Sequence, residues 1–411
     1  MVPFSVSGHR HARGPGGGVI LLVALVVITV SGCSVTRQPT ASHKVDVLGE
    51  PKGPTLVTGQ PAPAGTGDLG AVSCASRRRC WAVGVAGTDT TPPPRGATVI
   101  AATVDGGVSW KAQHVAGGAT PELNGISCPA ITECMAVGSN GSSQQGVGVV
   151  VTTSDAGAAW NPATAPAGAL TVKSVRCVSA ADCLAIVSDG SQLWSAQSAD
   201  FGQTWQRLGN LPGSFVGGDD LSCLAGGACL VAGYVPTTSA QGTGAVALSG
   251  NAGQTWALTA VPSGTGILLS AACLSASTCL AGGTKSTTVN DIVPDQGELL
   301  RSVDGGGTWT ALTGAPPVDD VYDMECPTAA VCAMVGTHWT GNPPVPTGAV
   351  AQSADGGATF EASSAAYIPI TLRALSCPTP AGCIAVGGDT VARMTLVAPQ
   401  PARHSHASTH S

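Results

Sequence analysis

The chain has 411 residues, of which 56 are glycine and only 10% are charged, and its formal net charge is −6. A negative charge argues against a nucleic-acid-binding protein, which would carry a basic surface. Abundant glycine and valine with few lysines favour β-structure with many tight turns over long amphipathic helices. A single compact core rarely reaches this length, so internal repeats have to be sought first.

Residues 1–32 are predicted to be a signal peptide. Arg10 and Arg13 form a basic region, and residues 19–30 are apolar apart from Thr29. This run is too short to span a bilayer comfortably and is typical of the core of a signal peptide. We therefore expect the mature protein to be exported.

The end of this segment, Val30-Ser31-Gly32-Cys33, resembles the lipobox of bacterial lipoproteins, although Val30 replaces the usual leucine. The resemblance implies that Cys33 receives a diacylglycerol and becomes the first mature residue, and acyl chains such as palmitate then hold the protein to the outer face of the plasma membrane. A transmembrane anchor or ordinary signal cleavage are the alternatives. Residues 33–53 have no periodicity and are interpreted as a tether.

Fourteen further cysteines form seven pairs, each with five residues between its members, and the pairs recur every 46 to 54 residues. This period is typical of β-propeller blades with four strands each. We therefore predict an all-β, seven-bladed propeller over residues 54–398 with one disulfide in each blade. The pairs are Cys74/Cys80, Cys128/Cys134, Cys177/Cys183, Cys223/Cys229, Cys273/Cys279, Cys326/Cys332 and Cys377/Cys383.

A zinc or redox role for these cysteines is the alternative. Zinc sites space their cysteines by two to four residues and add nearby cysteine or histidine. Here only His114 and His338 fall within the propeller. We therefore predict structural disulfides, no metal and no cofactor, which agrees with export to an oxidising compartment.

A second motif, Ser/Thr-x-Asp-x-Gly-x-Thr/Ser-Trp, runs in phase with the cysteine pairs. It resembles the Asp-box of bacterial neuraminidase repeats, in which the acidic residue is structural and not catalytic. The acidic positions of this box motif are Asp105, Asp155, Asp200, Asn251, Asp304 and Asp355, and the aromatic positions are Trp110, Trp160, Trp205, Trp256, Trp309 and Phe360.

The second unit shows how one blade is expected to form. Strand A covers residues 122–128, strand B 134–138 and strand C 147–153, and strand D begins at Ala159. The cysteines flank the A–B turn. The box aspartate accepts hydrogen bonds from N–H groups of the C–D turn, the glycine permits a positive φ, and the tryptophan fills the wide outer gap between blades.

The seventh unit lacks a box motif and a strand D. It offers strands A and B over residues 372–387 and strand C over 391–397. We predict that residues 55–58 supply its missing outer strand and close the ring, which removes an open sheet edge. Residues 399–411 are predicted to be a disordered tail.

Propellers of this kind bind ligands mostly on the face opposite the cysteine hairpins and box motifs. We call the position four residues before the first cysteine of each pair the mouth position, because it should lie at the central channel. The residue at the mouth position differs between repeats and is often polar or charged. The residue at the core position, two residues before the cysteine, is hydrophobic in every repeat. The mouth positions are Gly70, Asn124, Lys173, Asp219, Leu269, Tyr322 and Arg373; the core positions are Val72, Ile126, Val175, Leu221, Ala271, Met324 and Leu375.

The candidate ligand-binding residues are therefore Lys173, Asp219, Asp220, Tyr322, Asp323 and Arg373. The alternative is that they are solvated loop ends. Trp339, on an expected long loop over residues 337–348, is a further candidate, since an exposed tryptophan can anchor a glycan or protein, although it more often packs locally. Arg77, Arg78 and Arg79 lie in the first A–B turn and could meet anionic lipid or a partner, or form a solvated turn.

An enzymatic function is less favoured than a binding function. Sialidases with such repeats use an arginine triad and a Phe/Tyr-Arg-Ile-Pro motif, which is absent. Arg176 and Arg301 are expected toward the far face, so only Arg373 falls at the channel mouth. A glycan hydrolase would need two facing carboxylates, for which Asp219 or Asp220 with Asp323 is the available pair.

The repeats over residues 54–398 also resemble the photosystem II stability/assembly factors and, more distantly, sortilin-type propellers. Both are non-catalytic and bind polypeptides. The resemblance implies an extracytoplasmic scaffold, expected to be a monomer, that holds a protein, a glycan or another component of the cell envelope, with no photosynthetic role following from it.

Overall fold

The computed structural model describes residues 55–63, 68–85, 99–116, 121–140, 146–238, 240–288, 296–314, 316–363, 368 and 370–397. The predicted signal peptide, Cys33, the tether and the tail lie outside these residues. Within the described ranges, no helix has the length and apolar character needed to cross a membrane.

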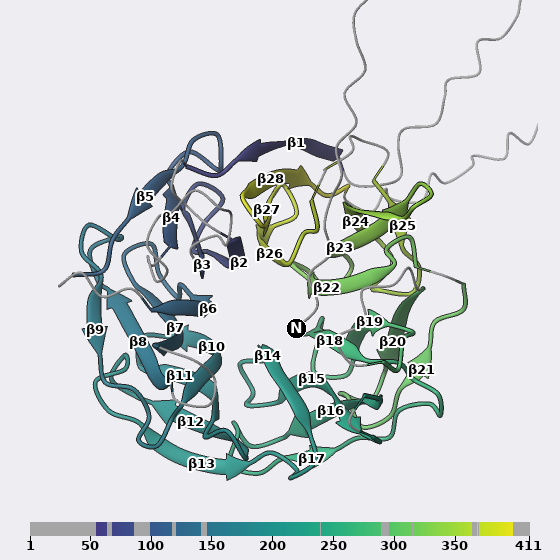
Figure 1. The fold of residues 1–411 in the computed structure, drawn as a ribbon, viewed down its shortest axis with the longest axis horizontal. Coiled ribbons are helices and arrows are strands. Elements are labelled where there is room, and N and C mark those ends of the chain that lie inside the picture. Colours follow the sequence, from purple (N-terminus) through teal and green to yellow (C-terminus); the bar gives the residue numbers. More distant parts are fainter. Residues whose placement is uncertain are drawn as a thin grey trace, which may run out of the picture. The chain divides into compact units, whose positions relative to one another are not determined.

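Residues 55–397 form seven four-stranded antiparallel sheets around a central axis (Figure 1). The first three blades are β2 (Asp68–Cys74), β3 (Cys80–Val85), β4 (Val99–Thr103) and β5 (Lys111–Gln113); β6 (Glu122–Ser127), β7 (Cys134–Asn140), β8 (Val147–Thr153) and β9 (Asn161–Ala163); and β10 (Thr171–Ser179), β11 (Asp182–Ser188), β12 (Leu193–Ser198) and β13 (Gln206–Asn210).

The next three blades are β14 (Val216–Cys223), β15 (Cys229–Pro236), β16 (Gly242–Ser249) and β17 (Ala257–Leu258); β18 (Leu268–Cys273), β19 (Cys279–Thr284), β20 (Gly297–Ser302) and β21 (Thr310–Ala311); and β22 (Asp320–Glu325), β23 (Cys332–Thr340), β24 (Val345–Ser353) and β25 (Glu361–Ala362). The seventh is β26 (Ala374–Thr379), β27 (Gly382–Gly387), β28 (Thr390–Thr395) and β1 (Thr55–Pro61). The predicted all-β, seven-bladed fold is confirmed.

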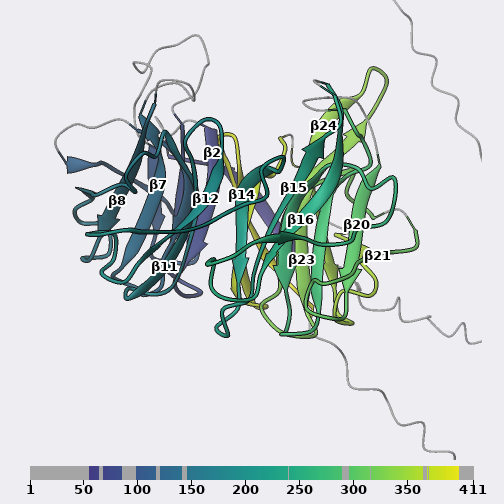
Figure 2. The same ribbon diagram turned by 90° about the horizontal axis from the view of Figure 1, so that it is seen from below.

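Each blade closes its first hairpin with the predicted disulfide. The seven bonds join the cysteines of each pair, whose Cα atoms lie 3.9 to 4.2 Å apart. The second cysteine of each pair begins or lies within strand B, which is buried on both faces between neighbouring blades. The disulfides therefore mark one face of the ring, which we call the hairpin face; the opposite face is the mouth face. Figure 2 shows the strands running between the two.

The hairpin of the third blade differs from the expected one. Its cysteines were predicted to flank the A–B turn, but Cys177 and Cys183 lie inside β10 and β11 and face each other in the ladder, and a further pair, Ser179 and Asp182, follows them. Only two residues are left for the turn, so the strands continue past the disulfide. Cys183 is 0% exposed, like the second cysteines of the other blades, which are at most 2% exposed. Cys383 lies inside β27 for the same reason, because Thr379 pairs with Gly382 beyond it.

The six box turns have the hydrogen bonds expected of them. In each, the carboxylate or amide oxygen accepts from the N–H four residues on at 2.8 to 3.0 Å. The preceding serine or threonine hydroxyl accepts from the glycine N–H at 2.7 to 2.9 Å. The residue before that glycine also has a positive φ, as at Ala156, Phe201 and Ala252, which the sequence did not reveal.

The box turns are also tied to the cysteine hairpins of their own blades. In five blades, the N–H of the residue before the box glycine donates to a carbonyl of the A–B turn, as from Ala156 to Thr132 at 3.0 Å. Both turns of such a blade lie on the hairpin face, so these bonds fix the two turns to each other there.

The box tryptophans pack between blades, as predicted. Trp160 is fully buried and its Nε1–H donates to Gln113 Oε1 of the preceding blade at 2.8 Å. Trp205, Trp256 and Trp309 likewise donate to a group of the preceding blade. Each indole therefore fills the outer part of an interblade gap and fixes its width.

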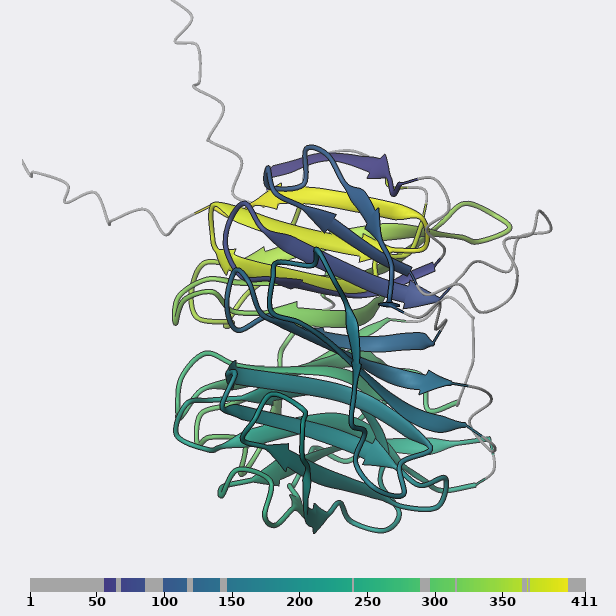
Figure 3. The same ribbon diagram turned by 90° about the vertical axis from the view of Figure 1, so that its left-hand side faces the viewer.

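The ring is closed by strand β1, as predicted. It pairs with β28 from Thr55↔Thr395 to Pro61↔Thr390, and it lies beside the seventh blade in Figures 1 and 3. The amino-terminal strand is thus the outer strand of the last blade, which covers the edge that β28 would otherwise expose.

Candidate functional site

The innermost strands of six blades carry an irregularity at the mouth position, whereas in the seventh blade β26 begins at Ala374, directly after the mouth position Arg373. In β2, β6, β10, β18 and β22 the register shifts by one residue at the mouth position, and in β14 the shift extends over Gly218 to Asp220. A bulge inserts an extra residue and redirects its side chain. The buried positions on either side of it, such as Leu123 and Ile126, are therefore three residues apart instead of two.

A cavity of about 860 Å³ opens at the centre of the ring and is lined by the mouth positions. Lys173 Nζ lies 2.8 Å from Asp219 Oδ1, which joins the third and fourth blades, and Arg373 Nη2 lies 3.9 Å from Asp68 Oδ2, which joins the seventh and first. Tyr322 is 36% exposed. Lys173, Asp219, Asp220, Tyr322, Asp323 and Arg373 all line this one cavity.

Below the mouth, we call the residues one and three positions before each first cysteine the wall positions; all of them except Ser127 and Ser270 line the cavity. Several of them bond to the next blade. Asp220 Oδ2 accepts from Ala271 N–H at 2.9 Å and from the Ser270 hydroxyl at 2.8 Å. Asp323 Oδ2 accepts from Leu375 N–H at 2.6 Å.

The other wall contacts follow the same rule. The Ser270 hydroxyl accepts from Met324 N–H, and the hydroxyls of Ser73, Ser127 and Ser376 each accept from the first cysteine N–H of the next blade at 2.9 to 3.0 Å. Glu325 accepts from Cys377 N–H in the same way. The predicted ligands Asp220 and Asp323 thus have a structural task in joining blades.

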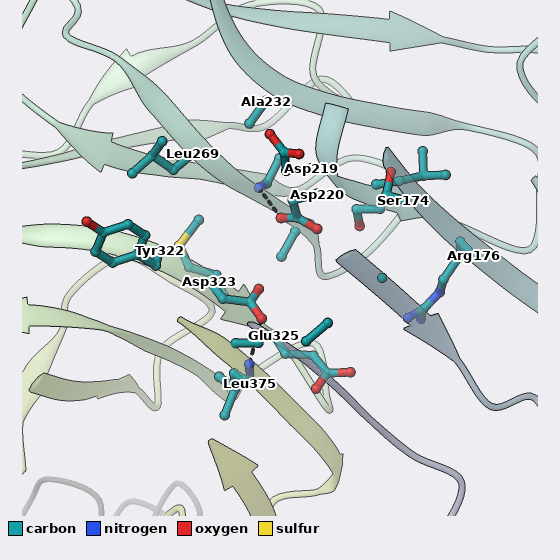
Figure 4. A pocket seen from close by; sticks show the side chains of 18 of the residues that line it. Ser174, Arg176, Asp219, Asp220, Ala232, Leu269, Tyr322, Asp323, Glu325 and Leu375 are labelled. Atoms are coloured by element: carbon teal, nitrogen blue, oxygen red, sulfur yellow. Dashed lines mark hydrogen bonds between the residues drawn. The ribbon is translucent and has the colours of Figure 1, made fainter. Parts of the chain in front are cut away.

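Three carboxyls and one guanidinium meet in this channel (Figure 4). Burial raises the pKa of Asp323 well above its ordinary value, and the nearby Asp220 raises it further. Burial also raises the pKa of Asp220 and of Glu325, while the positive charge of Arg176 acts to lower both. Burial in the channel therefore disfavours the charged form of all three carboxyls.

Arg176 and Glu325 are the channel residues that the sequence reasoning missed. Arg176 was expected toward the far face, which is wrong because the wall positions alternate with the buried core position along the strand. Side chains in a strand point alternately to its two faces, so Arg176 lies on the face opposite the buried Val175, where it is exposed and lines the cavity. The same rule would have identified Glu325 beside Met324.

Trp339 does not line the channel cavity. The expected long loop is instead a hairpin in which β23 and β24 continue to Thr340 and Val345. The Trp339 N–H donates to Asp319 Oδ2 at 2.8 Å, and its Nε1–H donates to Asp320 Oδ2 at 3.1 Å. His338 Nδ1 lies 2.8 Å from the same Asp319. This tryptophan packs locally and away from the other candidates.

Among the described residues, no three histidine, cysteine, aspartate or glutamate side chains are placed to hold a metal ion together. The channel carboxyls are separated by the backbone groups that they accept from, and Arg176 occupies their fourth side (Figure 4). The arrangement is suited to holding polar or charged groups of a ligand by ion pairs and hydrogen bonds at the mouth.

The raised pKa of the channel carboxyls predicts a pH dependence of stability. A carboxyl whose pKa is raised in the folded state favours folding below its unfolded pKa of about 4, and that contribution is lost as the pH rises through the folded pKa. The free energy of unfolding of the wild type should therefore decline from pH 4.5 to 7.5. Asp323→Asn keeps an oxygen for Leu375 N–H and should flatten this decline, as urea denaturation at three pH values would measure.

The control is Glu361→Gln, which changes an exposed carboxylate on the outer strand β25, away from the channel. It should leave the slope of stability against pH as in the wild type. Equal slopes for Asp323→Asn and the wild type would refute the role given to Asp323. The box carboxylates act with the opposite sign: hydrogen bonds from Thr308 lower the pKa of Asp304 to about 2, so their contribution is lost only as the pH falls below about 4.

Comparisons with known proteins find a similar fold among solved structures. No protein-family model and no curated protein matches the chain. A solved structure of YCF48 bound to D1 peptide is 15% identical, with a TM-score of 0.57 over 83% of this chain and 96% of that chain. YCF48 from Cyanidioschyzon merolae is 13% identical, with a TM-score of 0.54 over 83% and 99% of the two chains.

A catalytically inactive virginiamycin B lyase from Staphylococcus aureus with quinupristin is 10% identical, with a TM-score of 0.54 over 83% of this chain and 99% of that chain. The likeness is one of fold. A binding protein and a lyase share this propeller, so function has to be argued from the channel itself.

Proposed function

We propose that this chain is a non-catalytic binding or assembly scaffold that holds a protein or another component of the cell envelope at the mouth of its channel. The observation that carries the proposal is the ring of bulged mouth positions. They present Lys173, Asp219, Tyr322 and Arg373 on one face, over one cavity of about 860 Å³. A mixture of cation, anion and aromatic groups around an opening with a largely polar wall suits an extended polypeptide better than a small apolar ligand.

Three further points support this proposal. The carboxyls deeper in the channel accept hydrogen bonds from the neighbouring blade, so the wall is braced. A YCF48 propeller of the same fold has been solved with a peptide bound. The resemblance of residues 30–33 to a lipobox supports a scaffold on the outer face of a bacterial plasma membrane, anchored through Cys33 and acting as a monomer.

Quantitative crosslinking of the full chain in membranes tests this function. We expect the double variant Tyr322→Ala/Arg373→Ala to lower the yield of the main crosslinked product at least tenfold, because aromatic and arginine anchors contribute most to the binding energy of such interfaces. The matched control is Lys111→Ala/Glu361→Ala, which removes two exposed charged side chains from outer strands β5 and β25. Identical partner profiles in wild type and mouth variant would exclude the channel mouth.

A glycan hydrolase is the second candidate, favoured by one observation: Asp220 and Asp323 face the same cavity and their pKa values are raised, as a general acid requires. If the wild type cleaves any member of a broad glycan panel and Asp323→Asn abolishes that cleavage, the protein is an enzyme and the scaffold proposal is wrong. Absence of cleavage, with the crosslinks retained in Asp323→Asn, supports the scaffold.

A further inference from the structure

A second cleft lies on the hairpin face, where the first and seventh blades meet. It has a volume of about 490 Å³ and is lined by Arg77 and Arg78 from the A–B turn of the first blade and by Arg393 from β28. Residues 381–384 of the seventh blade form its opposite side. We call it the seam cleft, because it lies at the closure of the ring (Figure 3).

Glycines allow the arginine side chains to lie in this cleft. A Cβ atom on Gly382 would lie 3.4 Å from Arg77 Cγ and 3.6 Å from Arg77 Nε. A Cβ on Gly107, whose φ is +82°, would lie 3.1 Å from Arg393 Cγ. The stems of Arg77 and Arg393 are therefore packed against backbone contributed by the other blade at the edge of the cleft, while Arg77 stays exposed to solvent.

The three arginines have no neutralising partner in the described part of the chain. No carboxylate there forms an ion pair with Arg77, Arg78 or Arg393. Asp105 also lines the cleft. Its oxygens accept from the Ser109 N–H and hydroxyl and from the Thr103 hydroxyl, so they are already engaged, and these bonds lower its pKa.

Three positive charges against one engaged carboxylate leave the cleft cationic. Guanidinium groups bind phosphate oxygens through paired N–H donors, and this geometry makes arginine the preferred residue for such groups. The cleft therefore fits a phosphate-bearing anion.

The path of the chain brings this cleft toward the predicted anchor. Strand β1 begins at Thr55, which pairs with Thr395, and Thr395 lines the cleft. Only residues 34–54 separate Cys33 from that point. At full extension they span at most about 75 Å. Strand β1 thus enters the propeller on the hairpin face, so a lipid on Cys33 would be tethered to that face beside the seam cleft.

We propose that the seam cleft binds the phosphate group of an anionic membrane lipid and so turns the channel mouth away from the membrane. This inference rests on the lipid anchor of the proposed function. It gives the two faces different tasks: the hairpin face holds the lipid surface, and the mouth face meets the partner.

Binding of phosphatidylglycerol and phosphatidylcholine to the full chain in neutral detergent micelles tests this, with native mass spectrometry to count bound lipids. We expect at least tenfold tighter binding of phosphatidylglycerol by the wild type. Arg77→Ala/Arg393→Ala should weaken it about thirtyfold, at roughly fivefold for each arginine near an anionic surface. Arg77→Lys/Arg393→Lys, which keeps the charge, should lose less. Hydrogen exchange should slow at residues 76–80 and 381–384 only in the wild type with phosphatidylglycerol.

The matched control is Lys173→Ala/Arg373→Ala, which removes two positive charges from the mouth face and should leave lipid binding unchanged. Equal binding of both lipids by the wild type, or undiminished binding by Arg77→Ala/Arg393→Ala, would overturn the proposal. Inorganic phosphate that binds as tightly as phosphatidylglycerol would overturn the membrane assignment. If Arg77→Ala/Arg393→Ala loses lipid binding but keeps its crosslinked partner, the mouth face binds that partner independently of the seam cleft. If Tyr322→Ala/Arg373→Ala loses the partner but keeps lipid binding, the seam cleft binds lipid independently of the mouth face.

Discussion

Reduction of the seven disulfides is expected to unfold the propeller at 25 °C. Each bond closes a ring with a sequence separation of 6 residues. In the chain-entropy model such a ring stabilises the folded state by about 2 kcal/mol. The rings do not overlap along the chain, so their contributions are nearly independent and together match the roughly 5–15 kcal/mol by which a typical domain is stable.

Circular dichroism and tryptophan fluorescence before and after reduction would measure this effect. Thiol titration under denaturing conditions should find no reactive thiol among the fourteen paired cysteines before reduction and all fourteen afterwards. The control is Cys326→Ala/Cys332→Ala, which removes one bond and should lower the free energy of unfolding by only about 2 kcal/mol. A fully reduced protein with the melting temperature of the oxidised one would show that the disulfides do not stabilise the ring.

The second large effect is expected for Trp160→Ala. The indole is 0% exposed, it fills the gap between the first two blades, and its Nε1–H donates to Gln113 Oε1. Truncation leaves a cavity and an unpaired amide oxygen in the interblade core, so the free energy of unfolding should fall by about 3–5 kcal/mol. Urea denaturation followed by circular dichroism is the measurement.

Trp205→Ala is the matched control, since this indole occupies the same position in the next blade but is half-buried. It donates to the Thr164 carbonyl at 2.8 Å. We expect a loss of roughly 1–3 kcal/mol, because less apolar surface leaves water. If the two variants are equally stable, the box tryptophans do not stabilise the ring through burial between blades.

The channel shows where reasoning from the sequence stopped. The core position was recognised because it repeats as a hydrophobic residue in every unit, and Val175 and Met324 are buried as expected. Arg176 and Glu325 were missed, although each follows such a residue directly. The rule of alternating side chains was enough to place them, but only the bulge at the mouth position explains why Lys173 and Tyr322 also face the channel.

The functions of Asp220 and Asp323 show a different limit. Both were chosen as ligand-binding residues because they are acidic and close to the mouth, and both do line the cavity. Their oxygens nevertheless accept from Ala271 and Leu375 of the following blades, 51 and 52 residues away in the chain. A sequence contains no register between neighbouring blades, so contacts of this kind cannot be read from spacing.

The sequence determined the number of blades, the seven disulfides and the box turns, because each of these depends on residues that are close in the chain. It also determined the closing strand, because the seventh unit is the one that lacks a box motif and a strand D. The tertiary structure alone decided which side chains meet between blades. The Ser376 hydroxyl bonds to Cys74 N–H across 302 residues, and at the same seam Arg77 joins Arg393 in one cleft. Such pairs form only when the ring closes, since closure brings the first and last blades into contact.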